Sequence, residues 1–103
     1  ELDRESYLEL LQHITKRGGE PFSGVRIIMD ENGAFLSQSL DLSNNKIKVL
    51  TSDYLANGGS NMSFFTGKKQ EIIGLKVRDA IINHCLSNDT IISKLDNRLS
   101  IIK

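Results

Sequence analysis

The sequence predicts an α+β fold, and three patterns along the chain carry this prediction. An amphipathic helix comes first, two strands about an Asn-Gly turn and a third strand follow it, and a second helix precedes a closing strand. Helices and antiparallel strands that occupy separate stretches are typical of the α+β class. At 103 residues the chain has room for one domain, which covers residues 1–103.

The first helix is predicted over residues 6–16. Its apolar residues recur at helical spacing: Tyr7, Leu8, Leu11 and Ile14. Asp3 is the candidate N-cap, and Lys16-Arg17 followed by Gly18-Gly19 is a typical helix end. These signals together predict one amphipathic helix.

Three strands are predicted in the middle of the chain. The first two are residues 24–30 and 34–40, on either side of Glu31-Asn32-Gly33. Because an Asn-Gly dipeptide tolerates the positive φ angles of a tight turn, we expect an antiparallel pair. The third is residues 46–52, where charged and apolar residues alternate, and it is expected to place Asp53 and Tyr54 at its C-terminal end.

A second helix is predicted from about residue 70 or 74 to residue 87. Its apolar stripe is Leu75, Val77, Ala80, Ile81, Cys85 and Leu86. A short helical turn at 90–95 and a closing strand at 97–102 are expected after it. A lone cysteine in such a stripe is usually a small buried hydrophobe, so Cys85 is predicted to be inert.

The composition narrows the classes of partner. Thirteen basic and thirteen acidic residues give a net charge of zero, which disfavours binding to nucleic acid or to an anionic membrane. The apolar runs are too short to span a bilayer, and one cysteine excludes an internal disulfide. The chain begins without Met and enters a helical pattern at once, so we expect a trimmed product or a piece of something longer.

No catalytic or metal-ligating constellation is predicted in this chain. His13 and His84 lie in helical patterns without a His, Asp or Glu partner at i+3 or i+4. The carboxylates Asp30, Glu31, Asp41 and Asp89 occupy turn and cap positions. The pair Gly58-Gly59 lacks both the Lys-Ser/Thr ending of a P-loop and the three-glycine spacing of a dinucleotide fingerprint.

The stretch of residues 47–62, with Tyr54-Leu-Ala-Asn-Gly-Gly-Ser60 at its centre, resembles the signature of the C-terminal domain of the 5'-nucleotidase and UDP-sugar hydrolase family. Residues 21–26, 77–82 and 94–98 resemble the flanking motifs, so the resemblance covers nearly all of the chain. It implies the fold of that domain without its first strands.

The resemblance also implies site residues. Tyr54 takes the place of an aromatic that stacks on the nucleotide base, while Asn57, Gly58 and Gly59 keep their places beside it. Ser60 stands where the family has an Asp that binds the ribose hydroxyls. Asn61 and Met62 replace a Gly and an aromatic, so the pocket is expected to be altered there. A second stacking aromatic is absent at Gly19, and Phe22 is the nearest substitute.

In this family the chemistry belongs to a separate metallophosphatase domain that holds two metal ions and a His-Asp pair. The resemblance therefore implies a nucleotide or nucleoside ligand, no cofactor in this chain, and divalent metal ions in a partner domain of the same or another chain. It also implies a periplasmic or extracellular location, compatible with a bacterial source.

Two other readings stay open. One is a stand-alone module that binds a nucleoside, sugar or other flat ligand without catalysis. It is supported by Gly19, Ser60 and Asn61, which stand where the family has other residues. A structural or interaction domain fits if Tyr54 is an ordinary half-buried aromatic at a strand end. Phe64 and Phe65 either line the pocket or belong to the core, and core is the more common role.

Overall fold

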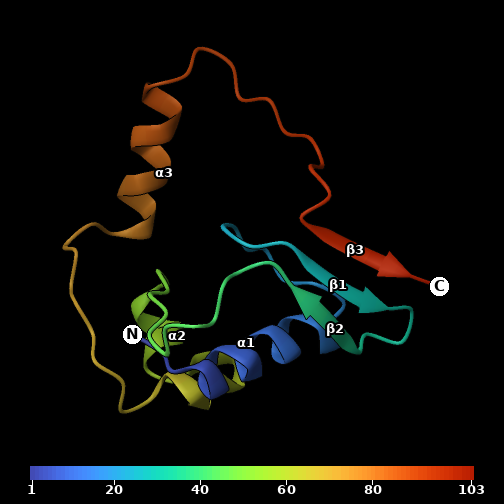
Figure 1. The fold of residues 1–103 in the computed structure, drawn as a ribbon. Helices are drawn as coiled ribbons and strands as arrows, with labels where there is room; N and C mark the ends of the chain where they lie inside the picture. Colours follow the sequence, from blue (N-terminus) through green and yellow to red (C-terminus); the bar gives the residue numbers. More distant parts are fainter.

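Helix α1 and a three-stranded sheet form the packed part of the molecule (Figure 1). A computed structural model describes residues 1–103. Its helices are α1 (Arg4–Lys16), α2 (Asp53–Ala56) and α3 (Val77–Leu86), with the 3-10 turns η1 (Gly59–Asn61) and η2 (Ser63–Phe65). Its strands are β1 (Ile27–Asp30), β2 (Phe35–Gln38) and β3 (Leu99–Ile102). The predicted α+β class is confirmed.

Helix α1 begins and ends at the residues whose chemistry marks its ends. The Asp3 side chain accepts a hydrogen bond from the Ser6 amide at 2.8 Å, so the predicted N-cap is confirmed. This bond lowers the pKa of the Asp3 carboxyl below its usual value. At the other end the Gly18 and Gly19 amides donate to the carbonyls of Thr15 and Ile14, which closes the last turn.

The predicted hairpin is confirmed, although its strands are shorter than expected. β1 pairs antiparallel with β2, and a bulge interrupts the register between Ile28 and Met29. Asp30 Oδ1 accepts hydrogen bonds from the amides of Asn32 and Ala34, which fixes the turn. Asp30 therefore has the structural role that its turn position predicted.

The closing strand β3 adds to the other edge of β1 in parallel, giving the strand order β2-β1-β3. Two arginines join the chain before β1 to the chain before β3. Arg98 Nη1 donates to the Phe22 carbonyl at 2.6 Å, and Arg26 Nη1 donates to the carbonyls of Asp96 and Asn97 at 3.3 Å. These hydrogen bonds fix where strand β3 begins.

Asp96 holds Arg98 in place, and its titration predicts a pH dependence of stability. Three hydrogen bonds from the Arg98 guanidinium, at 2.6, 2.8 and 3.0 Å, lower the pKa of Asp96 from 3.8 to about 2. Because the folded pKa lies below the unfolded one, the pair stabilises the fold above pH ~4 and loses this contribution as pH falls towards 2.

We expect Asp96→Asn to lower the melting temperature at pH 7 and to match the wild type near pH 2. Thermal denaturation of both proteins across this range measures the difference. A difference of the same size at pH 2 and pH 7 would show that the Asp96 charge has no part in it.

The predicted third strand at 46–52 is wrong. Only Ile47 pairs there, in an isolated antiparallel bridge to Leu2. The pairing stops after one bridge because the N-terminal segment that contains Leu2 enters helix α1 at Arg4. A strand needs a hydrogen-bonded neighbouring strand along its length. Ser52 instead caps α2, since its Oγ accepts from the Leu55 amide, so Asp53 and Tyr54 start a helix and do not end a strand.

The core lies between α1, β1 and the loops that follow the hairpin. Its nine buried members are Leu2, Tyr7, Leu10, Leu11, Ile14, Ile27, Ile47, Met62 and Phe65. Tyr7 donates its hydroxyl to Gln38 Oε1 at 2.8 Å, and burial raises the pKa of this phenol. His13 of α1 lies 5.9 Å from the Phe64 ring, and its buried Nε2 has no hydrogen-bond partner.

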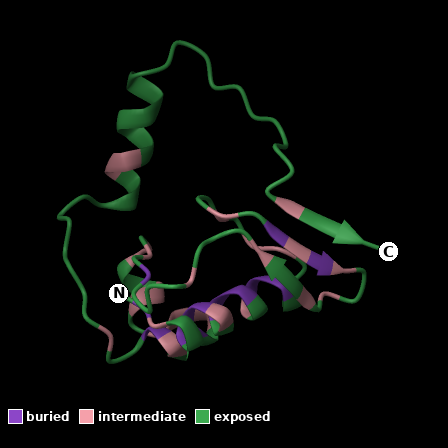
Figure 2. Cartoon of the chain, viewed as in Figure 1, coloured by how far each residue is buried: buried purple, intermediate pink, exposed green.

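The second helix and its surroundings differ from the prediction in three ways. α3 begins only at Val77, because Gly74 has a φ of +80° and Lys76 is extended. Residues 90–95 form no helical turn. Cys85 and the rest of the apolar stripe were expected to be buried, but nothing packs against them and α3 has no buried residue (Figure 2). No helix in the structure is both long and apolar enough to cross a membrane.

Candidate functional site

The α2 turn and the glycines after it border an open depression on the surface. α2 is a single turn, and Asp53 Oδ1 accepts a hydrogen bond from the Tyr54 amide at 2.8 Å within it. The helix stops at Asn57, because Gly58 then takes a left-handed φ of +95°. This conformation favours glycine, so the residue type at position 58 follows from the backbone.

Tyr54 lies directly against Gly59. A Cβ added at Gly59 would come within 2.5 Å of the Tyr54 Cε2 and Cζ atoms, so a side chain at position 59 and the ring would collide. The Ser60 amide donates a hydrogen bond to Tyr54 Oη at 3.3 Å. The ring is still 65% exposed, so the glycine backbone and this bond hold a flat aromatic surface towards solvent.

An open depression of about 570 Å³ lies beside the ring, lined by Asp53, Tyr54, Asn57, Gly58 and Gly59. The structure thus brings together four of the residues that the sequence predicted for the site. Ser60, the fifth, adjoins them through its bond to Tyr54, and its carbonyl accepts a 3.5 Å bond from Arg17 Nη2.

Phe22, the sixth predicted residue, does not line this depression. It is half-buried against the core, and its carbonyl is held by Arg98. Met62 was expected to alter the pocket, yet it is buried in the core at 3% exposure. Phe65 is buried as well and Phe64 is partly so, which agrees with the more common core role for the two. Tyr54 therefore has no aromatic partner across the depression.

Sequence reasoning missed Asp53 as a member of the site. Its side chain is exposed, lines the depression, and uses one carboxylate oxygen to bind the Tyr54 amide. A Ser followed by an Asp is a common helix start, and this signal in Ser52-Asp53 was available. It was overlooked because residues 46–52 were interpreted as a strand.

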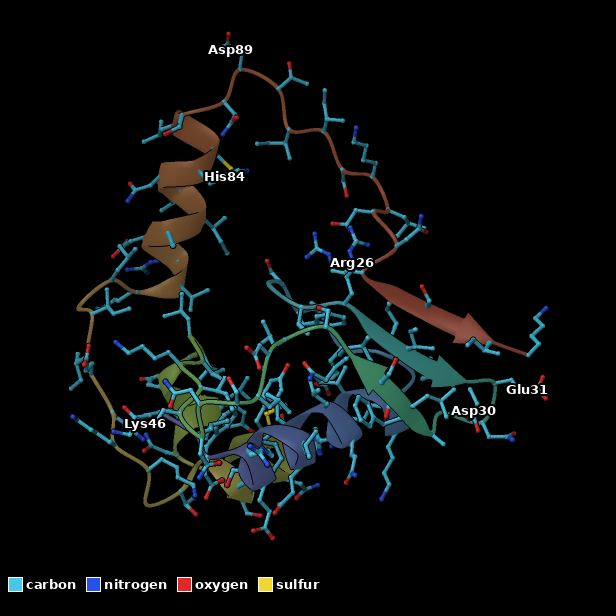
Figure 3. All side chains as sticks on the ribbon, in the orientation of Figure 1. Arg26, Asp30, Glu31, Lys46, His84 and Asp89 are labelled. Carbon is cyan, nitrogen blue, oxygen red and sulfur yellow. The ribbon has the colours of Figure 1, made fainter.

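Three other ionisable groups, Arg26, Asp96 and Arg98, gather at a second hollow. Figure 3 shows Asp30 and Glu31 at the hairpin turn, Lys46 near α2, and His84 and Asp89 on or just after α3. No group of three or more His, Cys, Asp or Glu side chains is placed to hold a metal ion. A smaller hollow of about 370 Å³ lies at Arg26 and Arg98, whose guanidinium groups already bind the 96–98 segment and Phe22.

No protein-family model, no curated protein and no solved structure matches this chain.

Proposed function

We propose that this chain is the nucleotide- or nucleoside-binding domain of a 5'-nucleotidase-like metallophosphoesterase. The observation that supports this proposal best is the Tyr54 ring, held against Gly59 at the edge of an open depression. A phenol ring offers the flat apolar surface on which a base stacks. Gly59 carries no Cβ, so the Tyr54 ring can lie against its backbone, and Gly58 takes the left-handed φ that ends α2.

Polar groups of the same depression suit the rest of a nucleoside. The second oxygen of Asp53 has no intramolecular hydrogen bond and is free to accept from sugar hydroxyls. The exposed Asn57 amide offers both donors and an acceptor. Asp53 thereby supplies the carboxylate that the family pattern places at position 60, where this chain has Ser60.

The phosphate chemistry belongs to another domain or a separate chain in this proposal. A metal-bridged water there attacks the phosphorus, while this chain holds the base and the sugar. Stacking on one ring contributes about 1–3 kcal/mol, and a few exposed hydrogen bonds add about 1 kcal/mol each. The isolated domain should therefore bind weakly, with a Kd of about 1 mM.

Substitution of Tyr54 tests the proposal. We expect Tyr54→Ala to weaken binding of adenosine and AMP by about 5- to 150-fold, because it removes the stacking surface. Tyr54→Phe keeps the ring and loses only the bond from the Ser60 amide, so its affinity should stay within about threefold of the wild type. NMR titration of each variant with adenosine, AMP and UDP-glucose measures these affinities.

Equal affinity of Tyr54→Ala and wild type, or no saturable binding by the folded wild type, would contradict the proposal. A binding module without catalysis is the second candidate, and it shares the titration result. The two differ in whether a metallophosphatase sequence with an Asp-x-His metal motif precedes this chain or accompanies it as a partner. Hydrolysis of AMP by the combined proteins would favour the enzyme.

A further inference from the structure

The segment between η2 and β3 carries most of the exposed apolar side chains of the chain. They are Ile72, Ile73, Leu75, Val77, Ile81, Ile82, Leu86, Ile91, Ile92 and Leu95. No residue from 71 to 95 hydrogen-bonds to a residue outside this range. Figure 1 shows α3 standing apart from α1 and the sheet, between two extended connections. An apolar surface of this extent marks an interaction site.

α3 also needs a packing partner in order to persist. It has 10 residues, and isolated helices shorter than about 12–15 residues are marginal in water. Its N-cap residue Lys76 makes no side-chain capping bond. Val77, Ile81 and Ile82 are β-branched, which further lowers the helix propensity. Tertiary contacts must therefore supply the stability of this helix.

One face of α3 is suited to such contacts. Val77, Ile81 and Cys85 follow one another at intervals of four residues, and Ala80 comes three residues after Val77, so they lie along one side of the helix. Asn83 lies on the opposite side, because it is about 160° from Ile81 at 100° per residue. The stripe of Val77, Ile81 and Cys85 is therefore an apolar side of a helix that has no packing partner in this arrangement.

The sheet has an uncovered face that fits this stripe. Ile27 of β1 is buried in the cluster with α1 and Met29 is also buried, whereas Ile28 between them is half-buried and points to the other side, where no helix packs. Its register partners on the neighbouring strands are Ser37 and Ser100, whose small side chains leave room on both sides of Ile28. A 10-residue helix is about 15 Å long and a four-residue strand about 13 Å, so the two match in length.

The connections let α3 reach this face of its own chain. Residues 67–76 and 87–98 can each span more than about 30 Å when extended, against a largest dimension of 39 Å for the whole chain. Because α3 is tethered at both ends, its effective concentration at its own sheet is of millimolar order, which favours that sheet over a second copy.

We propose that α3 docks through Val77, Ile81 and Cys85 on the open face of its own sheet, against Ile28 and Ile102, and adds a third layer to the fold. Ile102 lies on the same face as Ser100, two residues further along β3, and is 54% exposed. Docking covers apolar side chains of both partners. The structure described here is then the open arrangement of a segment that closes.

Cys85 is the only cysteine and lies in the apolar stripe of α3, so its chemistry can be used to detect docking of α3 on the sheet. In Ser100→Cys we expect mild oxidation of the dilute protein to form an intramolecular disulfide with Cys85. Ser63→Cys is the matched control, because Ser63 is equally exposed but lies in η2, which packs against α1 on the other side of the sheet. A disulfide in Ser63→Cys of equal yield, or only intermolecular disulfides in Ser100→Cys, would overturn the proposal.

Thiol reactivity gives a second readout that needs no added cysteine. Closure predicts that Cys85 of the native protein reacts with an aromatic disulfide reagent at least tenfold more slowly than in concentrated guanidinium chloride. Ile81→Asp should restore the fast rate, whereas Asn83→Asp, on the opposite side of the helix, should keep the slow rate. Equal rates in native and unfolded wild type would overturn the proposal, as would equal protection in the two variants.

Discussion

Gly59→Ala is expected to abolish the binding surface of Tyr54 while leaving the fold intact. The new Cβ would stand 2.5 Å from the ring, and the exposed ring must swing away from it and from the Ser60 amide. The backbone at Gly59 does not have a positive φ, so alanine itself is not strained there. Binding of AMP should fall as far as in Tyr54→Ala, and the free energy of unfolding should change by less than about 1 kcal/mol.

Gly24→Ala is the matched control for this prediction. Gly24 has a φ of +90° and open space around it, so alanine adds backbone strain of about 1 kcal/mol without touching Tyr54. This variant should lose stability and keep its affinity for AMP, the reverse of Gly59→Ala. Chemical denaturation and NMR titration of both variants measure the two quantities. If Gly59→Ala bound AMP as tightly as the wild type, contact of Tyr54 with Gly59 would have no role in binding.

Leu11→Ala is expected to have the largest effect on stability. Leu11 is 1% exposed and packs in the cluster that joins α1 to β1, to Ile47 and to Phe65 of η2. Truncation leaves a cavity among these side chains, and such a change costs about 2–5 kcal/mol. Because a domain of this size has a total stability of only about 5–15 kcal/mol, the variant should be close to unfolding at physiological temperature.

Leu86→Ala makes the same chemical change at a leucine that is 81% exposed on α3. It should change the free energy of unfolding by less than about 0.5 kcal/mol. Guanidinium denaturation of both variants, with a shared slope, gives the comparison. Equal losses at the two positions would mean that the cluster around Leu11 is not the core that holds the fold.

The sequence predicted correctly the elements that are marked by nearby cap and turn residues. Asp3, the glycine pair after Lys16, and Asn32-Gly33 act within a few residues, so α1 and the hairpin were found from them. The strand predicted at 46–52 depended on a partner that an alternating pattern does not reveal, and Leu2 supplies only one bridge. The apolar stripe of α3 marked a helix correctly but carried no information about what covers it.

The candidate site shows the same division. Tyr54, Asn57, Gly58 and Gly59 were grouped by the family resemblance, and because they follow one another within six residues they line one depression. Phe22 is distant in sequence, and its position depends on a bond to Arg98, 76 residues away. No pattern along the chain indicated this long-range bond, so the sequence did not reveal that Phe22 lies outside the depression.

The most direct test of the proposed function is an amide chemical-shift titration of the wild-type domain with AMP. Our account predicts saturable shifts that are largest between residues 53 and 60, with a Kd of about 1 mM. Shifts that are absent at saturating AMP, or that concentrate at residues 23–26 and 96–98 instead, would contradict it.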